Sequence, residues 1–100
     1  MASEEKIMTS HPQGKKGVHI LKRRYDFIKD FIVKTVEEHG EISYQQLNDL
    51  AVESLTKSFD GKVGWYLVTV KLDLEARNIL ERVPKSSPHR VRFGVAVANE

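Results

Sequence analysis

The run of residues 63–77 constrains the fold most, because it is apolar on two opposite faces of a helix. One face has the spacing i, i+4, i+7, i+11 and consists of Val63, Leu67, Val70 and Leu74. The opposite face has the spacing i, i+3, i+7 and consists of Trp65, Val68 and Leu72. The β-branched residues in this run also allow a strand, but the spacing and the length favour a helix. Since a helix that is apolar all round is usually buried, the run predicts a central helix.

The composition is that of one small globular domain. The chain has 100 residues, of which 40% are hydrophobic and 30% charged, and no apolar run approaches the ~18 residues of a membrane-spanning helix. The absence of Cys excludes disulfides, thiolate metal sites and a Cys nucleophile. The N-terminal residues lack the apolar core of a secretory signal, so we expect a cytoplasmic protein with no membrane segment.

Two further helices are predicted before the central one. The apolar face of the first consists of Leu21, Tyr25, Ile28, Ile32 and Val36, and Gly40 is its stop signal. Ser43 and Gln46 have the spacing of a capping box, which predicts that the second helix starts there, after a short strand at residues 41–42. The buried face of this second helix consists of Leu47, Leu50, Ala51, Leu55 and Phe59.

A β-hairpin is predicted after the central helix. Asn78 tolerates the left-handed conformation that closes a helix. Residues 79–83 and 89–93 then read as two strands, joined by a turn that contains two prolines.

The two ends of the chain are assigned to flanking segments. Residues 1–19 are polar, contain Pro and Gly and lack periodicity, which predicts an extended or mobile arm. The domain itself is placed at residues 20–94, and residues 95–100 are assigned to a C-terminal tail.

Charge is distributed unevenly along the chain. Residues 1–24 hold six Lys or Arg and two Glu, whereas residues 25–83 hold seven basic and eleven acidic residues. Residues 84–100 hold three Arg or Lys and one Glu, so basic ends flank an acidic middle in a chain of net charge +2. A negatively charged partner would therefore meet the arm and the C-terminal segment, although most such charges are simply solvated surface residues.

The predicted element order over residues 22–93 resembles the winged helix-turn-helix fold of the α+β class, with three helices, a short strand and a C-terminal β-hairpin wing. The segment VTVKLDLEARNILERVP, residues 68–84, looks like the end of a winged-helix third helix leading into its wing, with Asn78 where Gly is commoner. HPQGKKGVHI at residues 11–20 and FDGKVGWYLVTVKLDLEAR at residues 59–77 are similar to a family of small uncharacterised bacterial proteins. This resemblance implies a fold and carries over no catalytic residue or ligand.

In winged-helix proteins that bind DNA, the third helix enters the major groove and the wing meets the backbone or the minor groove. Our leading hypothesis is therefore a non-enzymatic, transcription-regulator-like domain that contacts the phosphates of double-stranded DNA through wing and arm. The candidate contacts in the arm and first helix are Lys15, Lys16, Lys22, Arg23 and Arg24. Those in the central helix are Lys62, Tyr66, Thr69 and Lys71, and those in the wing are Lys85, Ser86, Ser87, His89 and Arg90.

The second apolar face of the central helix argues against groove reading. Its residues carry none of the Arg, Asn, Gln or Lys side chains that read base edges. The face must be covered by the arm, by a second subunit or by a partner protein, unless the helix is buried on both sides. The alternative hypothesis is a protein-interaction module or homodimer, with an interface drawn from Trp65, Val68, Leu72, Phe27 and Phe31.

An enzymatic function finds little support in the sequence. The four His residues are scattered, and no H-E-x-x-H, G-x-S-x-G or phosphate-binding loop occurs. Asp73 and Glu75 lie two residues apart on a helix, so they point to different faces and are expected to be solvated. We therefore expect no catalytic residues, no metal, no cofactor and no small-molecule substrate.

Overall fold

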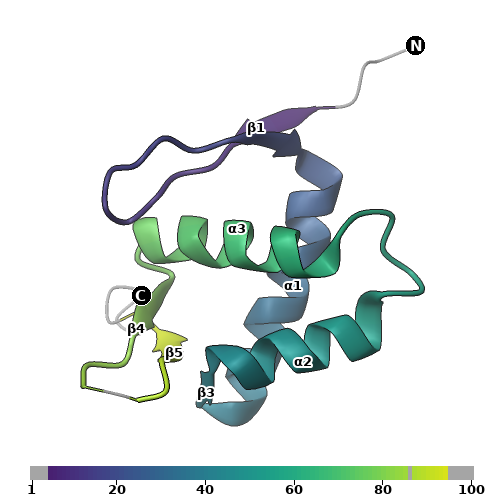
Figure 1. Cartoon of the computed structure of the whole chain (residues 1–100). Helices are drawn as coiled ribbons and strands as arrows, with labels where there is room; N and C mark the ends of the chain where they lie inside the picture. The colour runs from purple at the N-terminus through teal and green to yellow at the C-terminus, as the bar shows by residue number, and fades with distance from the viewer. Residues whose placement is uncertain (1–4, 86, 95–100) are drawn as a thin grey trace.

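The central element of the molecule is α3, Val63–Ala76, with α1 and α2 packed on one side and the N-terminal segment on the other (Figure 1). The computed structural model describes residues 5–85 and 87–94, and over these residues the fold is α+β, as predicted. It contains three helices and two small antiparallel sheets. The predicted tail at residues 95–100 lies outside the described residues.

The first two helices begin and end near the predicted signals. α1 spans Lys22–His39 and ends at Gly40, whose φ of 77° lets its N–H donate to Val36 O at 2.8 Å. α2 spans Tyr44–Leu55, and the N–H of Gln46 donates to the hydroxyl of Ser43 at 3.1 Å, so the predicted cap is confirmed.

Two boundaries differ from the prediction. Leu21 does not belong to the first helix: it is the last residue of a strand, and the helix begins one residue later. Phe59 lies beyond the end of α2 in the following turn, but its side chain is still buried against the core. The periodicity therefore recognised both as apolar residues of the domain but assigned each of them to the wrong element.

The C-terminal hairpin joins a three-stranded antiparallel sheet. β3, Glu41–Ser43, pairs with β5, Arg90–Phe93, which also pairs with β4, Leu80–Arg82, so the strand order is β3-β5-β4. Asn78 precedes β4 with a φ of 63°, which confirms the left-handed end of α3. We refer to β4, β5 and the turn between them as the wing.

The N-terminal arm contains a second hairpin that the sequence analysis did not predict. β1, Lys6–Met8, pairs antiparallel with β2, His19–Leu21, and Thr9 N–H donates to Val18 O at 2.9 Å. The loop returns so closely that a Cβ at Gly17 would lie 1.8 Å from the carbonyl oxygen of Thr9, so this position requires glycine. Strands of three residues are too short to give a periodic signal.

The core lies between the three helices and the wing. On α3 the face predicted to be buried is buried throughout, and it packs with Ile28 and Ile32 of α1 and Leu47 of α2. The opposite face is only partly covered: Val68 and Leu72 are half-buried, and the side chain of Trp65 is 46% exposed. Over the described residues, no helix combines the length and apolar character needed to cross a membrane.

Candidate functional site

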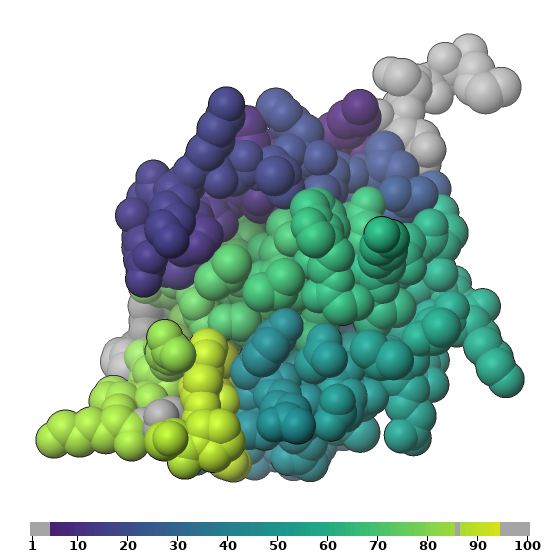
Figure 2. Space-filling view, viewed as in Figure 1, coloured from purple at the N-terminus to yellow at the C-terminus, as the bar shows by residue number. Residues whose placement is uncertain are grey.

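Residues 9–18, the loop between β1 and β2, lie along the outward face of α3 (Figures 1 and 2). Its backbone is fixed there by Ser10, whose N–H donates to Asp73 Oδ1 at 2.8 Å. A hollow of about 160 Å³ remains between this loop and the side chains of Trp65, Thr69 and Leu72. The arm therefore covers part of the outward face of α3, which is one of the alternatives that the sequence analysis left open.

Asp73 is completely buried, so the expectation that it is solvated is wrong. Its Oδ2 accepts a hydrogen bond from the hydroxyl of Tyr25 and another from Arg77 Nε at 2.8 Å. Burial, followed by the contact with Asp73, raises the pKa of the Tyr25 hydroxyl. This carboxylate joins α1 and the arm to α3, because Tyr25 of α1 and Ser10 of the arm each donate a hydrogen bond to it.

Lys71 is also buried, with 3% of its surface exposed, so it does not present a free ammonium to a phosphate. Its Nζ lies 2.8 Å from Glu75 Oε2 and 5.3 Å from the centre of the Tyr44 ring. The side chain of Glu75 is only 11% exposed, so the expectation that it is solvated is also wrong. A buried ammonium needs a carboxylate partner, and the i, i+4 spacing on α3 supplies one.

His89 lies at the start of β5, where its ring stacks on Tyr44 with a centroid distance of 6.1 Å. Its Nε2 is buried without a hydrogen-bond partner, 3.9 Å from Glu75 Oε2. Burial lowers the pKa of His89, and the charges of Lys71 and Arg82 lower it further against the opposing effect of Glu75. We call Lys71, Asp73, Glu75 and His89 the carboxyl-end cluster.

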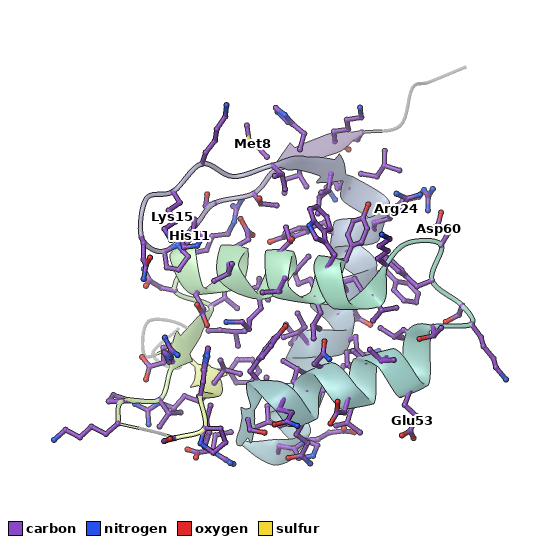
Figure 3. All side chains as sticks on the ribbon, viewed as in Figure 1. Met8, His11, Lys15, Arg24, Glu53 and Asp60 are labelled. Carbon is purple, nitrogen blue, oxygen red and sulfur yellow. The ribbon has the colours of Figure 1, made fainter. Side chains whose placement is uncertain are left out.

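The arm and the wing meet at the carboxyl end of α3. A pocket of about 340 Å³ is lined there by His11 and Gln13 of the arm and by Glu81 and Arg82 of the wing. Figure 3 shows His11 and Lys15 over this end of the helix. The exposed polar side chains of the two segments include Lys15, Lys16, Arg82, Lys85 and Ser87. Ser86, another predicted contact, lies outside the described residues.

The amino end of α3 carries a different arrangement, centred on Asp60. The carboxylate of Asp60 accepts hydrogen bonds from Arg23 at 3.0 Å and from Arg24 at 3.1 and 3.2 Å. Arg24 Nη1 also donates to the hydroxyl of Tyr66 at 2.9 Å. The hydrogen bonds from the two guanidinium groups lower the pKa of Asp60 to about 2. Arg24 and Asp60 lie together on this side of the molecule in Figure 3.

Four aromatic rings form a continuous series beside this ion pair, and we call them the aromatic ladder: Phe27, Phe59, Tyr66 and Trp65. The centroid distances between successive rings are 5.5, 5.1 and 4.9 Å. Phe59 in the middle is buried, whereas Phe27 and Trp65 at the two ends are 42% and 46% exposed. Offset and edge-to-face contacts of this kind hold aromatic rings firmly in place.

The remaining residues that were predicted to make contacts lie in different surroundings. Lys22 Nζ lies 2.8 Å from Asp26 Oδ2, and Arg90 Nε lies 2.8 Å from Glu41 Oε2, so both cations are bound to carboxylates. Lys62 is exposed at the start of α3, away from the wing. Of the predicted interface residues, Phe31 packs against the core and is half-buried. The sequence analysis treated the predicted contact residues as one footprint, whereas in the structure they form two groups.

Three residues that organise these ends were not recognised from the sequence. No sequence pattern identified Asp60, because its two partners lie far away in the chain. Tyr25 and Asp73 are 48 positions apart, so no sequence pattern linked the two residues. A signal for the second pair did exist, because a tyrosine on a buried helical face requires a polar partner for its hydroxyl.

Comparison with known proteins identifies a family for this chain. A model described as a family of unknown function (DUF6958) matches residues 6–91, which include the arm hairpin, all three helices and most of the wing. No curated protein and no solved structure matches the chain.

Proposed function

The chain belongs to this family of unknown function, and we propose that it is a winged-helix domain that binds nucleic acid through phosphate contacts from its arm and wing. The winged-helix interpretation is supported by the order α1, β3, α2, α3, β4, β5 and by the strand order β3-β5-β4. In this arrangement a strand between the first two helices pairs with the returning strand of the wing.

The observation that carries the proposed function is the convergence of two basic segments on one end of α3. Lys15 and Lys16 are exposed on the arm, and Arg82 and Lys85 are exposed on the wing. Both segments line the same pocket at the carboxyl end of the helix. Cations spread over two protruding segments fit a phosphate backbone, and they give affinity without reading sequence.

The covered face of α3 explains why the proposed binding is not sequence-specific. Thr69 and Leu72 lie beneath the arm, and Lys71 is bound to Glu75. Direct reading of bases requires donors or acceptors that reach the base edges in the groove. We therefore propose backbone contact alone, and a binding rather than a catalytic role.

The proposal is tested by fluorescence anisotropy with duplex DNA at low and at physiological salt. We expect binding that weakens steeply with salt, because each neutralised phosphate releases condensed cations. Charge reversal in a Lys15→Glu, Lys85→Glu variant should reduce affinity at least about tenfold at low salt. The matched control is Lys57→Glu, an exposed lysine in the loop between α2 and α3. Equal loss in the control, or no binding at low salt, contradicts the proposal.

The alternative of a homodimer through the outward face of α3 is less well supported by the geometry. The arm lies over Leu72, and Val68 is half-buried, so this stripe offers little continuous apolar surface to a second copy. A homodimer predicts a mass that rises with protein concentration and is insensitive to salt. Sedimentation at the two salt concentrations of the binding experiment measures this directly.

A further inference from the structure

Each exposed end of the aromatic ladder borders a hollow that is lined by a basic side chain. Trp65 borders the hollow of about 160 Å³ beneath the arm, which Lys16 also lines. Phe27 borders a hollow of about 240 Å³ that is lined by Arg23 and Arg24. An aromatic ring beside a cation therefore occurs twice, at opposite ends of one series of touching rings.

The charge of this surface is predominantly positive. The residues that line the two hollows include Lys16, Arg23 and Arg24 as cations and Asp60 as the one carboxylate. Lys62 adds a further exposed cation at the start of α3, next to the loop that carries Asp60. A partner that complements this surface is consequently anionic.

The exposed aromatic rings indicate which class of anionic partner fits this surface. Flat apolar rings with half-exposed surfaces bind groups that stack, and the buried ring of Phe59 and the hydrogen-bonded Tyr66 hold the two exposed rings in position. A duplex keeps its bases inside and cannot offer them to Trp65 and Phe27. Single-stranded nucleic acid offers a negative charge and a stackable base at every nucleotide.

We propose that the aromatic ladder is a binding surface for single-stranded nucleic acid, with one base stacked on Trp65 and another on Phe27. The phosphates between these bases are neutralised by Lys62 and Arg23, and Lys16 contacts the strand beyond Trp65. This surface centres on the amino end of α3. It shares Lys16 with the arm, but it requires neither Lys15 of the arm nor the cations of the wing.

Trp65 is the single tryptophan of the chain, so the intrinsic fluorescence of the unmodified protein reports on this surface alone. Titration with a short oligothymidylate should quench the emission in a saturable manner, because stacking of a base on the indole removes its fluorescence. Heparin and poly-glutamate are the comparison probes, since both are polyanions without bases. They should leave the emission nearly unchanged.

Two substitutions test the stacking itself, measured by anisotropy of a labelled oligothymidylate. Phe27→Leu and Trp65→Leu keep apolar bulk but remove the ring, and each should weaken binding about tenfold. Trp65→Tyr should restore most of the affinity. The matched control is Val52→Ala, which shortens an apolar residue of 42% exposure on α2 that belongs neither to the ladder nor to the lining of the two hollows. Thermal unfolding of every variant checks that the fold is retained.

The outcomes separate this inference from the proposed function. The Lys15→Glu, Lys85→Glu variant should lose duplex binding and keep the quenching by oligothymidylate. Absence of quenching, equal quenching by heparin, or unchanged affinity in Phe27→Leu overturns the single-strand proposal. Stronger quenching by poly-glutamate than by the oligonucleotide also overturns it, and identifies the ladder as a docking surface for acidic peptides.

Discussion

The two ends of α3 differ in whether the charged side chains there are buried. At the carboxyl end, Lys71 and Asp73 are buried at 3% and 0% exposure, and each is matched by partners within the fold. At the amino end, Asp60 remains in solvent with Arg23 and Arg24, beside aromatic rings that are nearly half exposed. Charges at the carboxyl end of α3 thus hold elements together, whereas the charges beside its amino end, on α1 and in the loop before α3, stay accessible.

This difference indicates which end depends on its charges for stability. A buried charge that loses its partner retains its desolvation cost, whereas an exposed charge exchanges its partner for water. Substitutions at the carboxyl end should therefore change the stability of the fold. Substitutions at the amino end should change binding and leave stability almost unaltered. The predictions below test this contrast in order of decreasing effect.

The largest effect is expected for Asp73→Ala. The change leaves the hydroxyl of Tyr25 and the N–H of Ser10 without their acceptor and detaches the arm from α3. We expect a loss of about 3 kcal/mol in the free energy of unfolding, measured by urea denaturation. The control is Asp49→Ala at an exposed position of α2. A loss equal to that of the control would show that the buried carboxylate does not hold these elements together.

The second effect concerns the buried pair of Lys71 and Glu75. Glu75→Leu leaves the ammonium buried without its carboxylate, and we expect a loss of about 2 to 3 kcal/mol. The double variant Lys71→Met, Glu75→Leu replaces both charges with apolar groups and should recover most of that loss. Denaturation of four proteins, namely the native protein, Glu75→Leu, Lys71→Met and the double variant, forms a double-mutant cycle. If the losses simply add, the two residues are not coupled as their 2.8 Å contact requires.

The sequence was sufficient for the helices because their signals are local. Gly40, the pair of Ser43 and Gln46, and Asn78 each act through a neighbouring turn, and each has the predicted role. The buried face of α3 was also predictable, since its four apolar residues repeat at the helical spacing. Patterns of this kind need no knowledge of distant parts of the chain.

The candidate site was only partly predictable because it depends on contacts between distant segments. Lys15 and Lys85 were identified by residue type alone, and Trp65 by its spacing on the outward face of α3. Lys71 was misassigned because its burial depends on the wing and on Tyr44, which no spacing along α3 reveals. The arm hairpin was missed because its strands have only three residues each. Its position on α3 could not be predicted either, because the hydrogen bond from Ser10 to Asp73 joins residues 63 positions apart.

A smaller effect is expected from pH at the carboxyl end. The fold lowers the pKa of His89, so between its unfolded value of about 6.5 and the lower folded value the unfolded chain binds more protons. Stability from this group is therefore present above about pH 6.5 and is lost as the pH falls below it, by at most ~1.4 kcal/mol per pH unit. Denaturation of the native protein and of His89→Gln at pH 7.5 and 5.5 measures the difference. The variant should lose less stability on acidification, and equal losses would contradict this role.

The smallest effect is expected for Asp60→Asn at the amino end. Asp60 lies in solvent and its ion pairs are screened, so the melting temperature at neutral pH should change far less than in Asp73→Ala. The sign of its pH dependence follows from a pKa lowered to about 2: its contribution is present above about pH 4 and is lost as the pH falls toward 2. Thermal unfolding at pH 7 and pH 3 compares the two substitutions. A shift in melting temperature at pH 7 as large as that of Asp73→Ala would remove the contrast between the ends, since it would make the exposed carboxylate as important to the fold as the buried one.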